Sequence, residues 1–118
     1  MTYRKEMTLK MNTKEIFKLK KMLEDAKIHF VTDDRSDFYD LFQIGYPDLP
    51  KSGNCVCSVI QGYFTYGNED NKLEIKGLLT DEEAKHDLVV GYLSAEEVFK
   101  RIESHYRGEG NEVLTQSS

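Results

Sequence analysis

Two cysteines stand one residue apart, Cys55 and Cys57, in the segment SGNCVCSVIQGYFTYGNED. Closely spaced thiols are typical of metal sites and redox-active disulfides. In a strand, however, both would lie on one face with Cα atoms roughly 6–7 Å apart, a poor fit to disulfides, whose Cα separation is usually ~4.4–6.8 Å with Cβ atoms turned inward. A zinc site needs further ligands, and no second cysteine pair or His-x₃₋₅-His motif supplies them. We predict buried structural thiols, with no metal and no cofactor.

Carboxylates and histidines offer acid–base chemistry. Glu69, Asp70 and His86 could form the acid and base of an unrecognised small hydrolase, but their spacing has little specificity for that role. A second group of carboxylates comprises Asp33, Asp34, Asp37 and Asp40. It lacks the glycine and the glutamate that a calcium-binding loop requires at fixed positions, so we predict that these side chains belong to a solvated loop. We assign no catalytic residue and predict a protein that is not an enzyme.

Basic and aromatic side chains together could bind a small nucleotide. Arginine or lysine would pair with its phosphates, and a tyrosine would stack on its base. The candidates are Lys18, Lys21 and Arg35 for the phosphates and Tyr63 or Tyr66 for the base. A sponge of this kind would need a homo-oligomer to enclose its ligand. A lysine stripe is also typical of the solvent side of an amphipathic helix.

Aromatic residues gather on the expected strands and at their ends. Tyrosine presents a large contact area at low entropy cost, and it is enriched at protein interfaces. Each ring taken singly is expected in the core, whereas the group as a whole favours a binding face. The group comprises Tyr39, Tyr46, Tyr63, Phe64, Tyr66 and Tyr92.

Two amphipathic helices are expected, over residues 13–27 and 95–106. The first begins at Asn12, which stands three residues before Glu15 as in a capping box, with Thr13 as the alternative cap. Ser94 and Glu97 have the same spacing before the second helix. Apolar residues recur at helical spacing in both segments.

Between the helices the pattern predicts strands. Residues 28–32 and 38–46 are rich in strand formers and flank the turn composition of 33–37. Residues 55–66 are apolar on both faces, which predicts a central strand covered on both sides, and Gly62 within it predicts a bulge or a close backbone approach. Residues 72–79 favour a strand over a short helix, and Thr80 with Glu83 could open a short helix.

These elements predict an α+β fold: an antiparallel sheet of three to four strands packed against two amphipathic helices in a single domain. We place that domain at 12–107, with 1–11 as an N-terminal extension or edge strand and 108–118 as a disordered tail. The chain has 118 residues and a net charge of -5, the wrong sign for a general nucleic-acid binder. No apolar run approaches the ~20 residues of a membrane span, and the start lacks the apolar block of a secretory signal, so a cytoplasmic location is expected.

Four blocks carry a resemblance to a known group: MNTKEIFKLKKMLEDAKI, VIQGYFTYGNED, LEIKGLLTDEE and VVGYLSAEEVFKRI. Across roughly residues 11–103, the chain resembles small, mostly uncharacterised proteins encoded by phages and prophages of Gram-positive bacteria. That group has no assigned catalytic motifs, so the resemblance implies a context and assigns no site residue. The context is a bacterial host cell, where small accessory phage proteins often bind antiviral machinery.

The hypothesis that follows is a non-enzymatic phage accessory protein that binds and neutralises a bacterial antiviral defence component. A protein target is favoured, because mixed charge and tyrosine-rich strands suit a protein interface. The alternatives are a sponge that sequesters a small cyclic nucleotide immune signal, and the small hydrolase described above.

Overall fold

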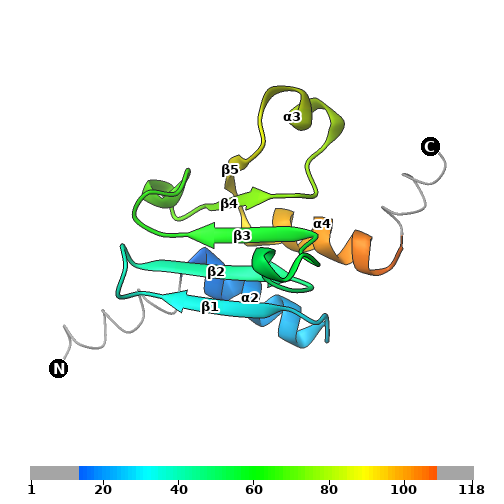
Figure 1. The fold of residues 1–118 in the computed structure, drawn as a ribbon, viewed down its shortest axis with the longest axis horizontal. Coiled ribbons are helices and arrows are strands. Elements are labelled where there is room, and N and C mark those ends of the chain that lie inside the picture. Colours follow the sequence, from blue (N-terminus) through cyan, green and yellow to red (C-terminus); the bar gives the residue numbers. More distant parts are fainter. Residues whose placement is uncertain (1–13, 109–118) are drawn as a thin grey trace.

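The computed structural model describes residues 14–108 as one antiparallel sheet with helices (Figure 1). The fold is α+β, as predicted. Along the chain the elements are α2 (Glu15–Asp25), β1 (Val31–Arg35), β2 (Leu41–Tyr46), the 3₁₀ turn η1 (Pro50–Ser52), β3 (Cys57–Gln61), the 3₁₀ turn η2 (Asn68–Asp70), β4 (Leu73–Lys76), α3 (Asp81–His86), β5 (Val90–Leu93) and α4 (Ala95–Tyr106).

The five strands pair in the order β1-β2-β3-β4-β5, each antiparallel to the next. In this meander the β1–β2 and β3–β4 connections lie at one end of the sheet, and the β2–β3 and β4–β5 connections lie at the other. Alternate residues point to opposite faces. Register places Ile44 opposite Val59 and Val59 opposite Ile75, so these three side chains share one face.

Helices α2 and α4 both pack on that face. Their fully buried residues join the strand residues in one hydrophobic cluster, which includes Ile16, Leu19, Leu23, Ile44, Val59, Leu73, Ile75, Val98 and Ile102. At one edge of the cluster, the Tyr46 hydroxyl lies 2.8 Å from Nδ1 of His105 in α4. Among residues 14–108, no helix packs on the opposite face of the sheet. We call it the open face.

Helix α4 begins as predicted, whereas α2 does not. The hydroxyl of Ser94 accepts a hydrogen bond from the Glu97 amide, and the Glu97 carboxylate accepts one from the Ser94 amide. In α2 the residue before the first turn is Lys14, which contributes no side-chain cap. The predicted Asn12 and Thr13 caps lie outside the described residues.

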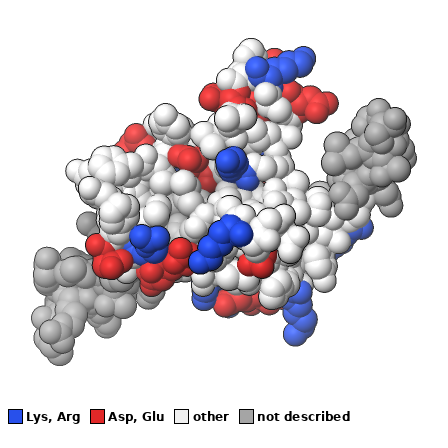
Figure 2. All heavy atoms as spheres, in the orientation of Figure 1, with Lys and Arg blue, Asp and Glu red and all other residues white. Residues whose placement is uncertain are grey.

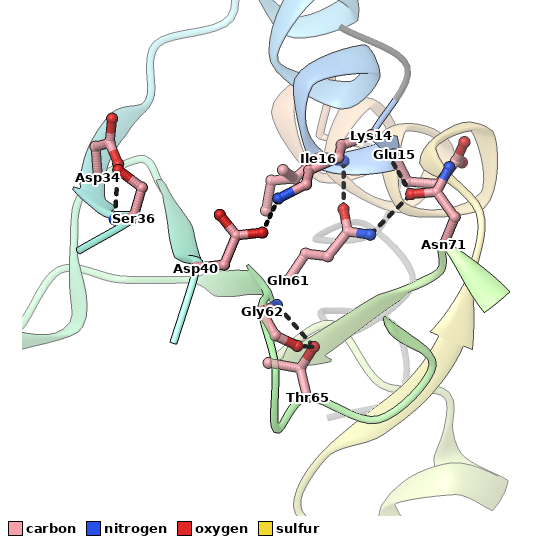
Figure 3. Close-up of polar contacts among 10 residues, drawn as sticks. All are labelled: Lys14, Glu15, Ile16, Asp34, Ser36, Asp40, Gln61, Gly62, Thr65 and Asn71. Atoms are coloured by element: carbon pink, nitrogen blue, oxygen red, sulfur yellow. Dashed lines mark hydrogen bonds and ion pairs between the residues drawn. The ribbon is translucent and has the colours of Figure 1, made fainter. Parts of the chain in front are cut away.

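Side chains far along the chain take the place of a local cap on α2. Gln61 Oε1 accepts from the Ile16 amide at 3.0 Å, and Asn71 Oδ1 accepts from the Glu15 amide at 3.0 Å (Figure 3). Gln61 Nε2 also donates to Asn71 Oδ1 at 2.8 Å. The Glu15 carboxylate in turn accepts from the Ala95 amide at 2.5 Å. The N-termini of both long helices are therefore tied to each other and to strand β3.

Helix α3 is a third, short helix that projects beyond the β4–β5 edge of the sheet (Figure 1). The predicted Thr80–Glu83 capping box is present at its start. Arg101 of α4 helps anchor this segment to the body. It donates from Nη1 and Nη2 to the Glu83 carboxylate at 2.8 and 2.9 Å, and from Nη1 to the Leu78 carbonyl at 2.9 Å. The Arg101 guanidinium lowers the pKa of Glu83 to about 2.

The sheet differs from the prediction in several respects, including the second strand, which begins at Leu41 and not at residue 38. It has five strands rather than three to four. The first strand runs over 31–35, so residues expected in the 33–37 turn are partly strand. The central strand ends at Gln61, not at 66, because Gly62–Tyr66 turn away from the ladder. Strand β3 is central, but the helices within the described part of the chain cover just one of its faces. Strand β4 confirms the prediction for 72–79.

Two predicted terminal segments fall mostly or wholly outside the described residues: the extension at 1–11 and, beyond Gly108, the tail at 108–118. Within the described range, none of the helices has the length and apolar character that crossing a membrane requires.

Candidate functional site

Two hairpin tips meet at one end of the sheet: the turn 36–40 between β1 and β2, and the loop 62–72 between β3 and β4. A backbone hydrogen bond joins them, from the Tyr63 amide to the Tyr39 carbonyl at 2.8 Å. The turn and the loop are also in close contact at Gly62, where a Cβ atom would lie 2.9 Å from the Leu41 Cα. Of the two sequence-based alternatives for Gly62, the close backbone approach is the one the structure shows.

Four aromatic rings from these tips pack against one another at the surface. We call them the aromatic surface: Phe38, Tyr39, Tyr63 and Phe64. The ring of Tyr39 lies 4.5 Å from that of Phe38, 4.7 Å from that of Phe64 and 6.5 Å from that of Tyr63, between centroids. Their exposed fractions are 51, 53, 71 and 70% in chain order. Rings that contact each other yet remain more than half exposed form a contiguous apolar patch on the solvent side.

Beneath these rings lies a hollow of about 250 Å³ at the edge of the open face. Leu41 of β2 and Ile60 of β3 form its floor, since neither points toward the helices. Glu74 of β4 and Thr65 supply polar groups. We call this cavity the aromatic hollow. Its full lining is Phe38, Tyr39, Leu41, Ile60, Tyr63, Phe64, Thr65 and Glu74.

Local hydrogen bonds hold both loops in shape. The Thr65 hydroxyl bonds the amide and the carbonyl of Gly62, each at 3.0 Å, and Asp40 forms an ion pair with Lys14 (Figure 3). Tyr39 and Asp40 both adopt left-handed backbone conformations, with φ of 56° and 55°. Residues other than glycine rarely adopt that backbone conformation. The surrounding contacts therefore hold the turn in a shape that presents Tyr39 outward.

Tyr66 lies beside this surface. Its amide donates to Glu74 Oε1 at 2.8 Å, and its carbonyl accepts from the Tyr92 amide at 3.3 Å. The Tyr92 hydroxyl donates to Glu69 Oε2 at 3.0 Å, and this bond, with burial, raises the pKa of Tyr92. Tyr92 of strand β5 thus contacts the 62–72 loop through both its backbone and its side chain.

The nucleotide-binding candidates are not brought together. Tyr63 belongs to the aromatic surface, and the guanidinium carbon of Arg35 lies 5.6 Å from the Phe38 ring centroid beside it. Lys18 and Lys21 lie on α2, which packs on the other face of the sheet. There Lys18 pairs with Glu96 at 2.7 Å, which raises the Lys18 pKa, and Lys21 lies 3.4 Å from Asp25.

The hydrolase candidates are divided between two elements with other partners. Glu69 and Asp70 form part of η2, before β4, and Glu69 bonds the Tyr92 hydroxyl. His86 ends α3, after β4, with Nε2 3.6 Å from the carboxylate of Glu82. Among the described residues, no group of three or more histidine, cysteine, aspartate or glutamate side chains is arranged to hold a metal ion.

The two thiols differ, which corrects the prediction that both are buried in a strand. Cys57 begins β3 on the helix-covered face, is fully buried, and burial raises its pKa to about 12. Cys55 precedes the strand, is only partly buried, and lines a second hollow of about 400 Å³ with Pro50 and Leu88 at the other end of the sheet. Neither thiol is in a disulfide.

The aromatic surface differs from the expected aromatic group at two residues, Tyr46 and Phe38. Tyr46 is 4% exposed and belongs to the core, because its position in β2 points it toward α4. Phe38 belongs to the aromatic surface although the sequence placed it in a strand. The available signal was its position directly after the polar segment 33–37, which has turn composition. Residues in turns are more exposed than residues in strands.

Comparisons with known proteins identify no relative. No protein-family model matches the chain. The curated proteins include no significant match, and neither do the solved structures. The resemblance to phage and prophage proteins therefore stays a prediction, and the aromatic surface is the feature from which a function can be inferred.

Proposed function

We propose that this chain is a non-enzymatic binding protein whose aromatic surface docks on a partner protein. The observation that carries the proposal is that four aromatic rings on two hairpin tips pack against one another while each remains more than half exposed. The resemblance to phage and prophage proteins supplies the context: the partner is a component of bacterial antiviral defence, which binding neutralises in the cytoplasm of the host cell.

Physical chemistry supports a protein partner. Single exposed apolar residues are common on protein surfaces, whereas contiguous ones mark interaction sites. Aromatic residues are enriched at interfaces and among the residues that dominate binding energy. The Tyr63–Tyr39 backbone bond and the Thr65–Gly62 bonds hold the loops before any partner arrives. A preformed surface loses less entropy on binding.

The geometry favours this proposal over the nucleotide sponge. Phosphate groups require converging cations, and Lys18 and Lys21 are paired with carboxylates on the opposite face from Tyr63 and Tyr66. The sponge stays a prediction, which the release of intact nucleotide on heating the protein would support.

Affinity capture from a Gram-positive host lysate tests the proposal. The double variant Tyr63→Ala/Phe64→Ala removes two rings without touching the core. The matched control, Leu88→Ala/Tyr106→Ala, removes two exposed side chains from elsewhere. We expect the wild type and the control to retain one specific protein that the double variant loses. Equal recovery by all three proteins, or no specific recovery by any, would contradict the proposal.

A further inference from the structure

We propose that the aromatic hollow receives an arginine side chain of the partner protein. This inference rests on the proposed function and specifies the partner's chemistry. The hollow combines an apolar floor of Leu41 and Ile60, aromatic walls, and one carboxylate, that of Glu74. Its volume of about 250 Å³ suits one long side chain better than a whole small-molecule ligand.

Aromatic walls and a carboxylate together are complementary to a guanidinium. The cation is attracted to the faces of tyrosine and phenylalanine rings, and arginine makes this contact more often than lysine. The guanidinium is planar and weakly hydrated, so it stacks on rings and enters partly apolar sites more readily than an ammonium. Its paired N–H groups also match a carboxylate. An uncharged apolar side chain would cover the charge of Glu74 without supplying a counter-charge.

Glu74 is positioned to act as that carboxylate. It is half-buried in β4, on the open face, and Oε1 accepts the Tyr66 amide at 2.8 Å. This bond fixes the carboxylate relative to the loop that carries Tyr63 and Phe64. A carboxylate has a second oxygen, here Oε2, with lone pairs that can accept from an incoming donor.

The molecule already contains the same contact on a smaller scale. The guanidinium of Arg35 lies over the ring of Phe38, with its carbon 5.6 Å from the ring centroid. One ring of the aromatic surface thus accommodates a guanidinium while Phe38 remains half-exposed. Tyr63 and Phe64, at 5.1 Å between centroids, offer further faces that Arg35 does not cover.

The charge around the hollow favours a basic partner. The segments 33–40 and 62–74 contain seven acidic and two basic residues. Figure 2 shows acidic side chains, with a basic group among them, around a surface of other residues at this end of the molecule. Such a field attracts cationic surfaces and speeds their association in a salt-dependent way. It repels phosphate, so a nucleic acid is disfavoured as the occupant.

Peptide titration of the full-length, ¹⁵N-labelled protein tests the inference. Three short peptides differ only at one central residue: arginine, lysine, or citrulline, which keeps the shape of arginine but not its charge. We expect the arginine peptide to shift the Tyr66 and Gly62 amides and to bind at least about tenfold more tightly than the citrulline peptide. Equal binding of citrulline, or tighter binding of lysine, would overturn the assignment.

Matched variants locate the binding. Glu74→Gln keeps an oxygen for the Tyr66 amide but removes the charge, and Phe64→Leu keeps apolar volume but removes a ring. Each should weaken the arginine peptide by about tenfold. Glu82→Gln makes the same charge change on α3, away from the hollow, and should leave binding unchanged. Unchanged binding in both hollow variants, with their amide spectra intact, would overturn the inference.

Failure of the arginine inference can be distinguished from failure of the proposed function. If lysate capture depends on Tyr63 and Phe64 but is unaffected by Glu74→Gln and by salt, the aromatic surface binds a partner and the arginine assignment is wrong. If the arginine peptide binds in a Glu74-dependent way while no specific host protein is captured, the hollow is a guanidinium site and the proposed function is wrong.

Discussion

Replacing Gln61 by methionine should destabilise the fold strongly, because this side chain joins strand β3 to the first turn of α2. Gln61 is 2% exposed, and its Oε1 accepts the Ile16 amide at 3.0 Å. Methionine has a similar volume and cannot accept that bond. An unsatisfied buried donor costs about 1–3 kcal/mol, and loss of an N-terminal cap costs about 0.5–2 kcal/mol. These figures describe overlapping effects, so we expect a loss of about 2–3 kcal/mol.

Urea and thermal unfolding measure this loss. For a domain of this size, ~1 kcal/mol lowers the melting temperature by about 4–8 °C, so Gln61→Met should melt roughly 10–20 °C below the wild type. The matched control is Gln43→Met on the open face, where Nε2 of the partly exposed Gln43 donates to the Ser58 hydroxyl at 2.8 Å and caps no helix. That variant should lose less than about 1 kcal/mol. A Gln61→Met loss no larger than the control's would refute the capping role.

Two further predictions concern ionisable groups. The folded-state pKa of Glu83, about 2, lies below its unfolded value, so the Arg101–Glu83 pair contributes stability above about pH 5 that is lost as pH falls toward 2. The difference in unfolding free energy between the wild type and Glu83→Gln, measured by urea unfolding and about 1–2 kcal/mol at neutral pH, should therefore shrink on acidification. A constant difference would contradict the pairing. Burial of Cys57 with a pKa of about 12 predicts that a disulfide reagent at pH 8 labels Cys55 slowly and Cys57 only after unfolding. Mass spectrometry of the labelled protein checks this, and rapid double labelling of the folded chain would show that Cys57 is accessible.

Local patterns predicted several elements well. Helix 95–106 has the predicted bounds because its start is encoded locally, by the Ser94–Glu97 pair and an apolar period. The short helix after Thr80 and the strand within 72–79 follow from equally local signals. The α+β class follows from the order of these elements, since a sheet with an apolar face must bury it against helices.

Longer strands were the weaker predictions. The alternation of 55–66 is compatible with one continuous strand, yet β3 ends at Gln61 because Gly62 lies against Leu41 and the Thr65 hydroxyl bonds both backbone groups of Gly62. Those contacts involve the neighbouring hairpin as well as the segment itself. Periodicity records which residues can alternate and does not record where a neighbouring chain turns them away.

The candidate site shows the same division. Composition alone indicated that aromatic residues could form a binding face, and three residues of that group, Tyr39, Tyr63 and Phe64, lie in the aromatic surface. The meander decided which rings meet, because it turns the β1–β2 and β3–β4 connections at the same end of the sheet. It also directed Tyr46 into the core, through the face on which its strand position falls.

The sequence by itself determined the fold class, the α4 cap and the supply of exposed-surface aromatics, because propensity, capping and alternation act over a few neighbouring residues. Only the tertiary structure decided that Gln61 and Asn71 cap α2, and that the hollow forms between two hairpins. Each of these contacts joins residues that are separated along the chain, and strand pairing brings them into reach.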